Sequence, residues 1–357
     1  MEVTVSPSII YNINTISMDF EERVRRRNAF DASLVYGTKK FNLATGRKTH
    51  MEERERNDNQ WTNSETGVIH DHFADHRVCP LCGQDAQNAQ VLFVKYGFPH
   101  LKCNGCGLVY VDPILNAVEY EKHYRTEHSW EAVLESPDQI QMQTLEGAYS
   151  LDIASLYLTD NRPVSICDVG CGPGTLLAEA KRRGYDVFGI EPNSYCHPFL
   201  EKYGIPYIGD FFPLKHEVGK QFDCVFLLNV LEHMRDPRET LLETKKIVKP
   251  GGLIYISTPN MDAFVNRIMH EKASVFGGHV HLQIFNAKTL EMILRKAGFE
   301  PLEYETIITQ IGTIKNYLSY QDPYFGDTEE QFSFLTPEML YKNHMARNIN
   351  MVGRRIE

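Results

Sequence analysis

The sequence lacks the features that mark a membrane protein or a nucleic-acid-binding protein. Its best candidate for a membrane span, residues 224–231, is far shorter than the roughly 18 apolar residues that a spanning helix needs. Basic residues are also in deficit, with 37 Lys and Arg against 47 Asp and Glu and a net charge of −10. Such a chain is a poor match for the phosphate backbone of nucleic acid. Residues 1–4 do not begin a basic stretch followed by an apolar one, so we expect no secretory signal.

Cysteine is scarce as well, with eight residues in 357, which is too sparse for a disulfide scaffold. Four of the eight are scattered through apolar or glycine-rich stretches: Cys167, Cys171, Cys196 and Cys224. Isolated thiols in buried-looking segments favour a reducing compartment, so we expect a cytoplasmic protein.

The chain divides into regions of different character, and its length predicts about two domains. Residues 1–70 are polar and charge-balanced and read as a solvated N-terminal extension, with a lid or dimerisation arm as the alternative. Residues 71–115 hold paired cysteines, and residues 116–160 read as a helical linker or cap. Residues 161–357 form the largest unit and carry an aromatic-rich insertion at 310–344, which could cover a substrate, pack as core or form a dimer face.

The largest unit alternates strand-like and helix-like segments. We expect strands at 164–167, 185–190, 222–228 and 253–257, and helices at 174–183, 194–203, 237–248 and 287–296. Such alternation builds an α/β domain whose mainly parallel sheet is covered by helices.

Two cysteine pairs form the strongest metal-binding signal. Cys79 and Cys82 are followed, after 20 residues, by Cys103 and Cys106, which gives the spacing C-x2-C-x20-C-x2-C. Two tight turns of this kind present four sulfurs to one tetrahedral zinc ion. Four thiolates leave no open coordination position, so we expect structural Zn²⁺ in a small zinc-ribbon lobe. A site that has lost its metal and a redox pair are the alternatives.

A glycine-rich loop follows the first strand of the largest unit. Asp168 precedes Gly170, Cys171, Gly172 and Gly174, and a helix begins directly after them. Glycines allow a tight turn and a close approach of the backbone to a ligand, and the helix start favours an anionic group. The pattern differs from the dinucleotide fingerprint and from the phosphate-binding loop.

Two further acids follow later strands of the same unit. Glu191 ends the second strand, 23 residues after Asp168, where a carboxylate can accept hydrogen bonds from ribose hydroxyls. Asp210 stands where a third strand should end, and Phe211 beside it could pack on an adenine ring. All three strand ends should face one crevice at the carboxyl edge of the sheet, where such folds bind ligands.

The motifs together resemble class I S-adenosylmethionine-dependent methyltransferases over roughly residues 140–310. The resemblance rests on Asp-Val-Gly-Cys-Gly-Pro-Gly at 168–174, Gly-Ile-Glu-Pro at 189–192, the segment 222–233, and Val-Lys-Pro-Gly-Gly at 248–252. It implies a Rossmann-like sheet of seven strands whose last strand is antiparallel. The sixth and seventh strands would then be 302–308 and 350–355.

The resemblance also implies roles for individual residues around S-adenosyl-L-methionine. The loop from Gly170 to Gly174 would hold the methionyl part, and Glu191, followed by Pro192, would hold the ribose. Asp210 and Phe211 would hold the adenine. Asn229 would lie beside the sulfonium.

The cysteine-pair lobe makes the chain similar to bacterial methyltransferases that act on sugars and small natural products, including sugar C-methyltransferases. In that family a histidine after the fourth strand and a His-x-x-Tyr-Phe-Ser segment after the fifth serve as active-site groups. His233 matches the first, and the segment His281–Asn286 matches the second in part, with Val280 in place of the family's preceding glutamate. We take His233 and His281 as candidate catalytic bases, with His279 as a third candidate. The alternative is that they only form hydrogen bonds at the pocket rim.

The leading interpretation is a methyltransferase that acts on a hydroxyl or carbon of a small molecule such as a sugar or secondary metabolite. A ribosomal-RNA-type methyltransferase with a zinc ribbon is the second interpretation, but the acidic charge and the segment 229–232, Asn-Val-Leu-Glu, argue against methylation of nucleic-acid bases. A non-catalytic cofactor-binding protein is the third. A homodimer is a further expectation.

Overall fold

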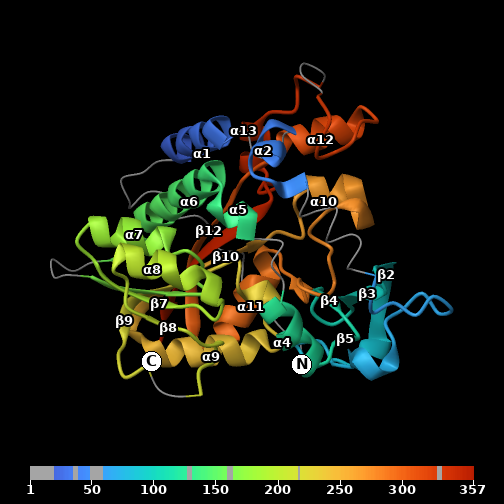
Figure 1. The fold of residues 1–357 in the computed structure, drawn as a ribbon, viewed down its shortest axis with the longest axis horizontal. Coiled ribbons are helices and arrows are strands. Elements are labelled where there is room, and N and C mark those ends of the chain that lie inside the picture. The colour runs from blue at the N-terminus through green and yellow to red at the C-terminus, as the bar shows by residue number, and fades with distance from the viewer. Residues whose placement is uncertain are drawn as a thin grey trace, which may run out of the picture.

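A computed structural model describes residues 20–34, 39–48, 59–126, 131–158, 164–215, 218–327 and 332–357. Its centre is a seven-stranded sheet with the order β12-β13-β10-β9-β6-β7-β8 (Figure 1). The strands are β6 (Ser165–Val169), β7 (Asp186–Ile190), β8 (Tyr207–Ile208), β9 (Phe222–Leu228), β10 (Val248–Pro259), β12 (Phe299–Ile307) and β13 (Asn348–Arg355).

The directions of the strands confirm the predicted Rossmann-like sheet. β6 runs parallel to both β7 and β9, β8 runs parallel to β7, and β10 runs parallel to β9. The last strand, β13, lies antiparallel between β10 and β12. Because the chain leaves β6 for β7 on one side and returns to β9 on the other, a crevice is expected at the carboxyl end of β6.

Helices cover both faces of the sheet (Figure 1). Ile166 and Phe226 pack with side chains of helices α6 (Pro137–Ser155), α7 (Thr175–Arg182) and α8 (His197–Tyr203) on one face. Cys167 and Leu227 pack with α9 (Pro237–Ile247) and α11 (Ala287–Lys296) on the other. This alternation follows from the two-residue period of a strand, and the apolar character of successive residues reflects burial of both faces.

The predicted helices are present within a few residues of their expected bounds. They are α7 (Thr175–Arg182), α8 (His197–Tyr203) after the 3-10 turn η4 (Ser194–Cys196), α9 (Pro237–Ile247) and α11 (Ala287–Lys296). α11 starts where predicted because the Asn286 side chain accepts from the Thr289 amide, and the Asn286 amide donates to the Thr289 side-chain oxygen.

The cysteine-pair lobe is an antiparallel sheet with the order β11-β4-β3-β2. Its strands are β2 (Ala89–Lys95), β3 (Phe98–Cys103), β4 (Val109–Val111) and β11 (Gln283–Ile284), and β1 (Ala74–Asp75) pairs separately with β5 (Ile114–Leu115). The fourth strand of the lobe comes from a segment 170 residues away in the chain, so lobe and large domain share one hydrogen-bonded sheet. Their buried side chains also form one cluster, which includes Leu108, Tyr110 and Phe285.

A hairpin turn at Tyr96 and Gly97 joins β2 and β3 of the lobe, and both residues have positive φ, 51° and 80°. Two successive residues with positive φ are typical of the tight turns that join antiparallel strands.

Part of the N-terminal extension is folded onto the large domain. In α1 (Phe20–Leu34), Val24 and Arg27 are buried, and Arg27 donates to the Thr306 carbonyl oxygen at 3.0 Å. The described part of residues 1–70 is therefore not the solvated arm that its polar composition suggests. The contact face of this helix cannot be recognised from its sequence, which contains four arginines and two glutamates. Long charged side chains can nevertheless be buried when they are paired.

The other α-helices in the described part of the chain are α2 (Lys39–Ala44), α4 (Ala117–Thr126), α5 (Glu131–Glu135), α6 (Pro137–Ser155), α10 (Phe264–Met269), α12 (Ile311–Leu318) and α13 (Pro337–Lys342). The insertion between β12 and β13 divides its aromatic residues: Tyr341 is buried under Arg27 of α1, whereas Tyr320 and Phe334 are exposed. Within the described ranges, no helix has the length and apolar character that a membrane crossing requires.

Candidate active site

The glycine loop lies between the end of β6 and the start of α7. Gly170, Gly172 and Gly174 all have positive φ, at 70°, 52° and 74°. A Cβ atom on Gly170 would lie 2.7 Å from Val230 and one on Gly174 would lie 2.5 Å from Leu200, so both positions require glycine. Around Gly172, by contrast, no heavy atom lies within 4 Å of a built Cβ, which leaves open space on one side of the loop.

Glu191 closes this loop from the end of β7. Its two carboxylate oxygens accept hydrogen bonds from the backbone amides of Gly172, at 2.7 Å, and Asn193, at 2.8 Å. The side chain is buried, and this burial raises its pKa, against the opposing effect of the two amide hydrogen bonds.

Asp168 lies at the end of β6, beside the glycine loop, and its carboxylate has fewer hydrogen bonds than that of Glu191. It is 3% exposed, and its Oδ1 atom has no hydrogen-bond partner among the described residues. Burial, followed by the negative charge of Glu191, raises the pKa of Asp168 well above its ordinary value. A buried acceptor without a donor is costly, so this oxygen marks a place for a ligand that donates hydrogen bonds or carries positive charge.

The other predicted cofactor residues lie at the same edge of the sheet. Asp210 follows β8 closely, and its Oδ1 atom accepts from the Phe211 amide at 2.8 Å. Asn229 follows β9 with a positive φ of 55°, and its Oδ1 atom accepts from Asn348 of β13 at 2.9 Å. Pro192 and Cys171 are neighbours of Glu191 and Gly172 in the chain. The sheet thus brings all predicted cofactor residues to the ends of β6, β7, β8 and β9.

His233 lies beyond β9 in the 3-10 turn η5 (Leu231–His233) and is half-buried. Its Nδ1 atom is 2.7 Å from the Tyr124 hydroxyl of α4 and 3.0 Å from the Val280 carbonyl oxygen. A carbonyl oxygen only accepts, so in the tautomer that donates to Val280 the proton sits on Nδ1 and the lone pair sits on Nε2, whereas a proton donated by Tyr124 would correspond to the other tautomer.

His281 forms a pair with His233, and His279 faces a different group of side chains. The His233 and His281 rings meet edge to face with centroids 4.9 Å apart, and His281 Nδ1 lies 2.6 Å from the Val275 carbonyl oxygen. His279 is 2% exposed, and its ring contacts Trp61 and His123 at 5.5 and 5.0 Å. His279 and His281 thus contact different groups of side chains, and residues 278–280 between the two form bends rather than an extended strand.

Glu232 is a neighbour of the histidine pair that sequence reasoning did not single out. It is fully buried, its Oε2 atom accepts from Thr258 at 3.0 Å, and its Oε1 atom has no hydrogen-bond partner. That oxygen lies 3.8 Å from His233 Nε2. Burial raises the pKa of Glu232 to about 8. Its position directly before His233 is the feature of the sequence that could have marked Glu232 as part of the site. That feature is weak, because an acidic residue in a helical turn is usually solvated.

The four cysteines of the lobe come together as the spacing predicts. Their sulfur atoms all lie within 4.8 Å of one another, with Cys79 and Cys106 at 3.5 Å and Cys82 and Cys103 at 3.4 Å. A tetrahedral zinc ion with bonds of about 2.3 Å separates its sulfurs by about 3.8 Å, so the cluster has approximately the size of a four-thiolate zinc site. All four cysteines are free thiols.

Comparison with known protein families agrees with this arrangement. A family model described as a methyltransferase domain matches residues 142–304, the range that contains the glycine loop, both acids and the histidine pair. The strand order and the antiparallel last strand are those that the motifs imply. Residues 142–304 form a class I, S-adenosylmethionine-dependent methyltransferase domain.

Curated relatives of the methyltransferase domain are named ubiquinone biosynthesis O-methyltransferases. The protein of Ruegeria pomeroyi is 29% identical over 168 residues, which cover 44% of this chain and 65% of the relative. The protein of Saccharophagus degradans is 31% identical over 150 residues, which cover 38% of this chain and 63% of the relative. The chain thus spans just under two thirds of the length of these relatives.

The methyltransferase domain also has solved structural neighbours. One is the Haemonchus contortus phosphoethanolamine N-methyltransferase 2 in complex with S-adenosyl-L-methionine, with 15% identity and a TM-score of 0.47 over 70% of this chain and 63% of that chain.

Proposed function

We propose that this chain is an S-adenosylmethionine-dependent methyltransferase that transfers a methyl group to a hydroxyl, or a carbon, of a small molecule such as a sugar or secondary metabolite. The observation that carries the proposal is the group of residues at the carboxyl edge of the sheet. There, an open-sided glycine loop lies between the buried acids Asp168 and Glu191, and within the described residues one Asp168 oxygen lacks a donor.

The residues of the crevice fit the cofactor in charge and in shape. Gly170, Cys171, Gly172 and Gly174 would hold the methionyl part, since the space beside Gly172 allows a ligand to approach the backbone. The cationic groups of the cofactor match the negative charge of the buried Asp168.

The nucleoside would occupy the remaining part of the crevice. Glu191 and Pro192 would hold the ribose, because a carboxylate at the end of the second strand can accept from both hydroxyls. Asp210 and Phe211 would hold the adenine by a hydrogen bond and by ring packing. Asn229 would lie beside the sulfonium.

The histidines would serve the acceptor. Bound S-adenosylmethionine supplies an electrophilic methyl group on a positively charged sulfur. An acceptor oxygen held in line with that methyl group would receive it, and the electron pair of the broken carbon–sulfur bond would stay on sulfur. His233 Nε2 would take the hydroxyl proton, and His281 would assist as its ring neighbour. His279 is the weakest of the three candidates, because it is buried against Trp61.

Orientation of the acceptor and the cofactor would account for the rest of the rate enhancement. Holding acceptor, methyl and sulfur in line replaces an encounter in solution, and well-oriented reactions reach effective molarities of about 10⁵ M or more.

The four-cysteine cluster would bind structural zinc, since four thiolates leave no position open for a substrate. We expect a small molecule rather than nucleic acid as the acceptor, given the net charge of −10.

Thermal unfolding with and without the cofactor tests this proposal. S-adenosylmethionine should raise the melting temperature of the wild-type chain, because a ligand of the native state stabilises it by mass action. Glu191→Ala should abolish the rise, whereas Glu271→Ala, at an exposed glutamate outside the crevice, should preserve it. A wild-type melting temperature that does not respond to the cofactor would refute the proposal.

A further inference from the structure

The backbone around His233 is held from outside. His233 ends the single 3-10 turn η5, which is closed by a hydrogen bond of 3.0 Å from the His233 amide to the Val230 carbonyl oxygen. So short a turn has few internal hydrogen bonds, and its place therefore depends on contacts with other parts of the chain. We call residues 231–235 the His233 segment.

Every carbonyl oxygen of the His233 segment accepts a hydrogen bond from a residue outside the segment. In the order of the five acceptors, the donors are Gln283 Nε2 at 2.8 Å, the Leu282 amide at 2.8 Å, the Tyr120 hydroxyl, Gln283 Nε2 again at 2.9 Å, and Arg77 Nη1 at 3.2 Å. Arg77 belongs to the cysteine-pair lobe, Tyr120 to the helix α4 that follows it, and Gln283 to β11, the fourth strand of its sheet. The lobe and the elements joined to it thus hold this segment.

Gln283 is the central member of this set. Its side chain is fully buried, and its Oε1 atom accepts from both Nη atoms of Arg77 at 3.2 Å. A guanidinium only donates, so the amide oxygen must face Arg77 and the amide nitrogen must face the two carbonyl oxygens of the His233 segment. Arg77 therefore fixes the orientation in which Gln283 can hold the segment.

The guanidinium of Arg77 is itself fully used. Its Nε atom donates to the Val111 carbonyl oxygen of β4 at 3.0 Å. Its Nη atoms donate to the carbonyl oxygens of Arg235 and Leu282 and, from both atoms, to Gln283 Oε1. All five N–H groups thus have acceptors, which a lysine ammonium with three N–H groups could not reproduce.

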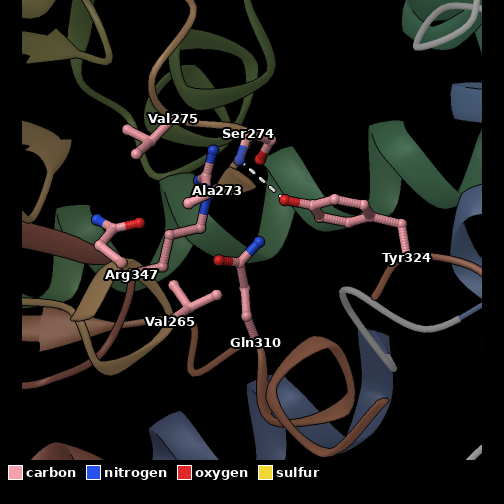
Figure 2. Close-up of a pocket in the computed structure, with 8 residues that line it drawn as sticks. Val265, Ala273, Ser274, Val275, Gln310, Tyr324 and Arg347 are labelled. Atoms are coloured by element: carbon pink, nitrogen blue, oxygen red, sulfur yellow. Dashed lines mark hydrogen bonds between the residues drawn. The ribbon is translucent and has the colours of Figure 1, made fainter. Parts of the chain in front are cut away.

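His281, the partner of His233, rests on a different part of the chain. Its Nδ1 atom lies 2.6 Å from the carbonyl oxygen of Val275. Figure 2 shows Val275 beside Ser274, whose amide donates at 2.8 Å to the hydroxyl of Tyr324 in the insertion between β12 and β13. The cavity between these side chains measures about 10 Å³, room for about one water, so this support is closely packed. The histidine pair therefore has two supports, and the lobe supplies that of His233.

We propose that Arg77 and Gln283 are positioning residues, through which the cysteine-pair lobe fixes the His233 segment in the place that a base requires. The inference rests on the proposed function, because it takes His233 as the base for the acceptor hydroxyl. Arg77 lies two residues before Cys79, so the lobe gains a part in methyl transfer beyond its own stability. Displacements of about 1 Å in such a group are costly for catalysis.

Hydrogen–deuterium exchange of the full chain, loaded with S-adenosylhomocysteine and read by mass spectrometry, tests the inference without a known acceptor. Arg77→Met and Gln283→Met remove the donors and keep the length of the side chains. Exchange in residues 229–236 should become about tenfold faster or more in both variants, because carbonyl oxygens of the segment lose their partners. Exchange in the glycine loop, residues 168–176, should not change.

Three further variants serve as comparisons. Arg77→Lys keeps the charge and some of the donors, so its exchange should lie between wild type and Arg77→Met. Arg238→Met in α9 and Gln90→Met in β2 make the same substitutions at exposed positions and should leave the exchange of residues 229–236 unchanged.

The side-chain ¹⁵N signals of His233 provide a readout of the base itself. They are identified as the signals missing from His233→Ala, and they should move in Arg77→Met and Gln283→Met but not in the two exposed controls. Unchanged exchange in residues 229–236 in either variant, equal acceleration in the glycine loop, or unmoved His233 signals would overturn the inference.

The same samples separate this inference from the proposed function. Uptake of S-adenosylhomocysteine with unchanged exchange in both Met variants would overturn the positioning role alone. Failure of the wild-type chain to take up S-adenosylhomocysteine would overturn the proposed function, and with it the role of His233 as the base.

Discussion

Replacement of Glu232 by glutamine should make the chain more stable at alkaline pH and leave it nearly unchanged at acidic pH. Glu232 is fully buried, and one of its carboxyl oxygens has no partner. Its pKa is raised from 4.5 to about 8. The folded state therefore holds a proton that the unfolded chain has lost throughout this interval. It follows that stability falls as the pH rises from about 4.5 to about 8 and levels off above that.

The size of the effect follows from the same interval. At about 1.4 kcal/mol per pH unit, the interval from 4.5 to about 8 is worth about 5 kcal/mol, of which about 3 to 4 kcal/mol is lost between pH 5 and pH 8. Glutamine stays neutral and keeps an oxygen for Thr258, so it avoids this loss.

Urea unfolding at pH 5, 6.5 and 8 measures the prediction. The difference in unfolding free energy between Glu232→Gln and wild type should be small at pH 5 and reach about 3 to 4 kcal/mol in favour of the variant at pH 8. Titrations elsewhere in the chain, including those of the cysteines, cancel in this difference. Glu271→Gln, at an exposed position, serves as the control. A difference that does not change with pH would refute the assignment of a raised pKa to Glu232.

Three further predictions concern the metal, the base and the cofactor. The purified chain should carry about one zinc ion per molecule by elemental analysis. Cys103→Ser should lose the ion and with it much of the stability of the lobe, because zinc binding contributes on the order of 10 kcal/mol of folding free energy. Stable protein without metal would contradict the zinc assignment. His233→Ala should bind the cofactor as wild type does but turn over about 10² to 10⁴ times more slowly in a methyl-transfer assay, and unchanged turnover would exclude His233 as the base. S-adenosylmethionine should bind with release of protons, because burial and the charge of Glu191 raise the Asp168 pKa and the bound cation favours the ionised carboxylate. Its affinity should therefore fall by up to about tenfold per pH unit as the pH is lowered and Asp168 becomes protonated. Calorimetry in buffers of different ionisation enthalpy should show the proton release, and identical heats in all buffers would contradict it.

The sequence predicts those parts of the fold that local patterns determine. β9 and α11 have the predicted bounds, because a fully buried strand reads as one apolar run and because Asn286 forms a capping box. The glycine loop and the two strand-end acids are likewise recognisable from their order, since parallel strands bring their carboxyl ends to one edge.

Features that depend on contacts between distant segments could not be predicted in this way. β11 joins the sheet of the lobe across 170 residues, and its two residues are too few to show a period. The polar helix α1 buries Arg27 beside Glu305 and Tyr341, partners that only the folded chain brings together. Glu232 lies beside His233 and its pair His281 through the fold, and no motif marks it.

Calorimetric titration of the wild-type, zinc-containing chain with S-adenosylmethionine and S-adenosylhomocysteine tests the central claim most directly. We predict that both bind with one-to-one stoichiometry, compete for one site, and lose binding in Glu191→Ala. A folded chain that takes up neither compound would contradict the assignment of the crevice between Asp168 and Glu191 as a cofactor site.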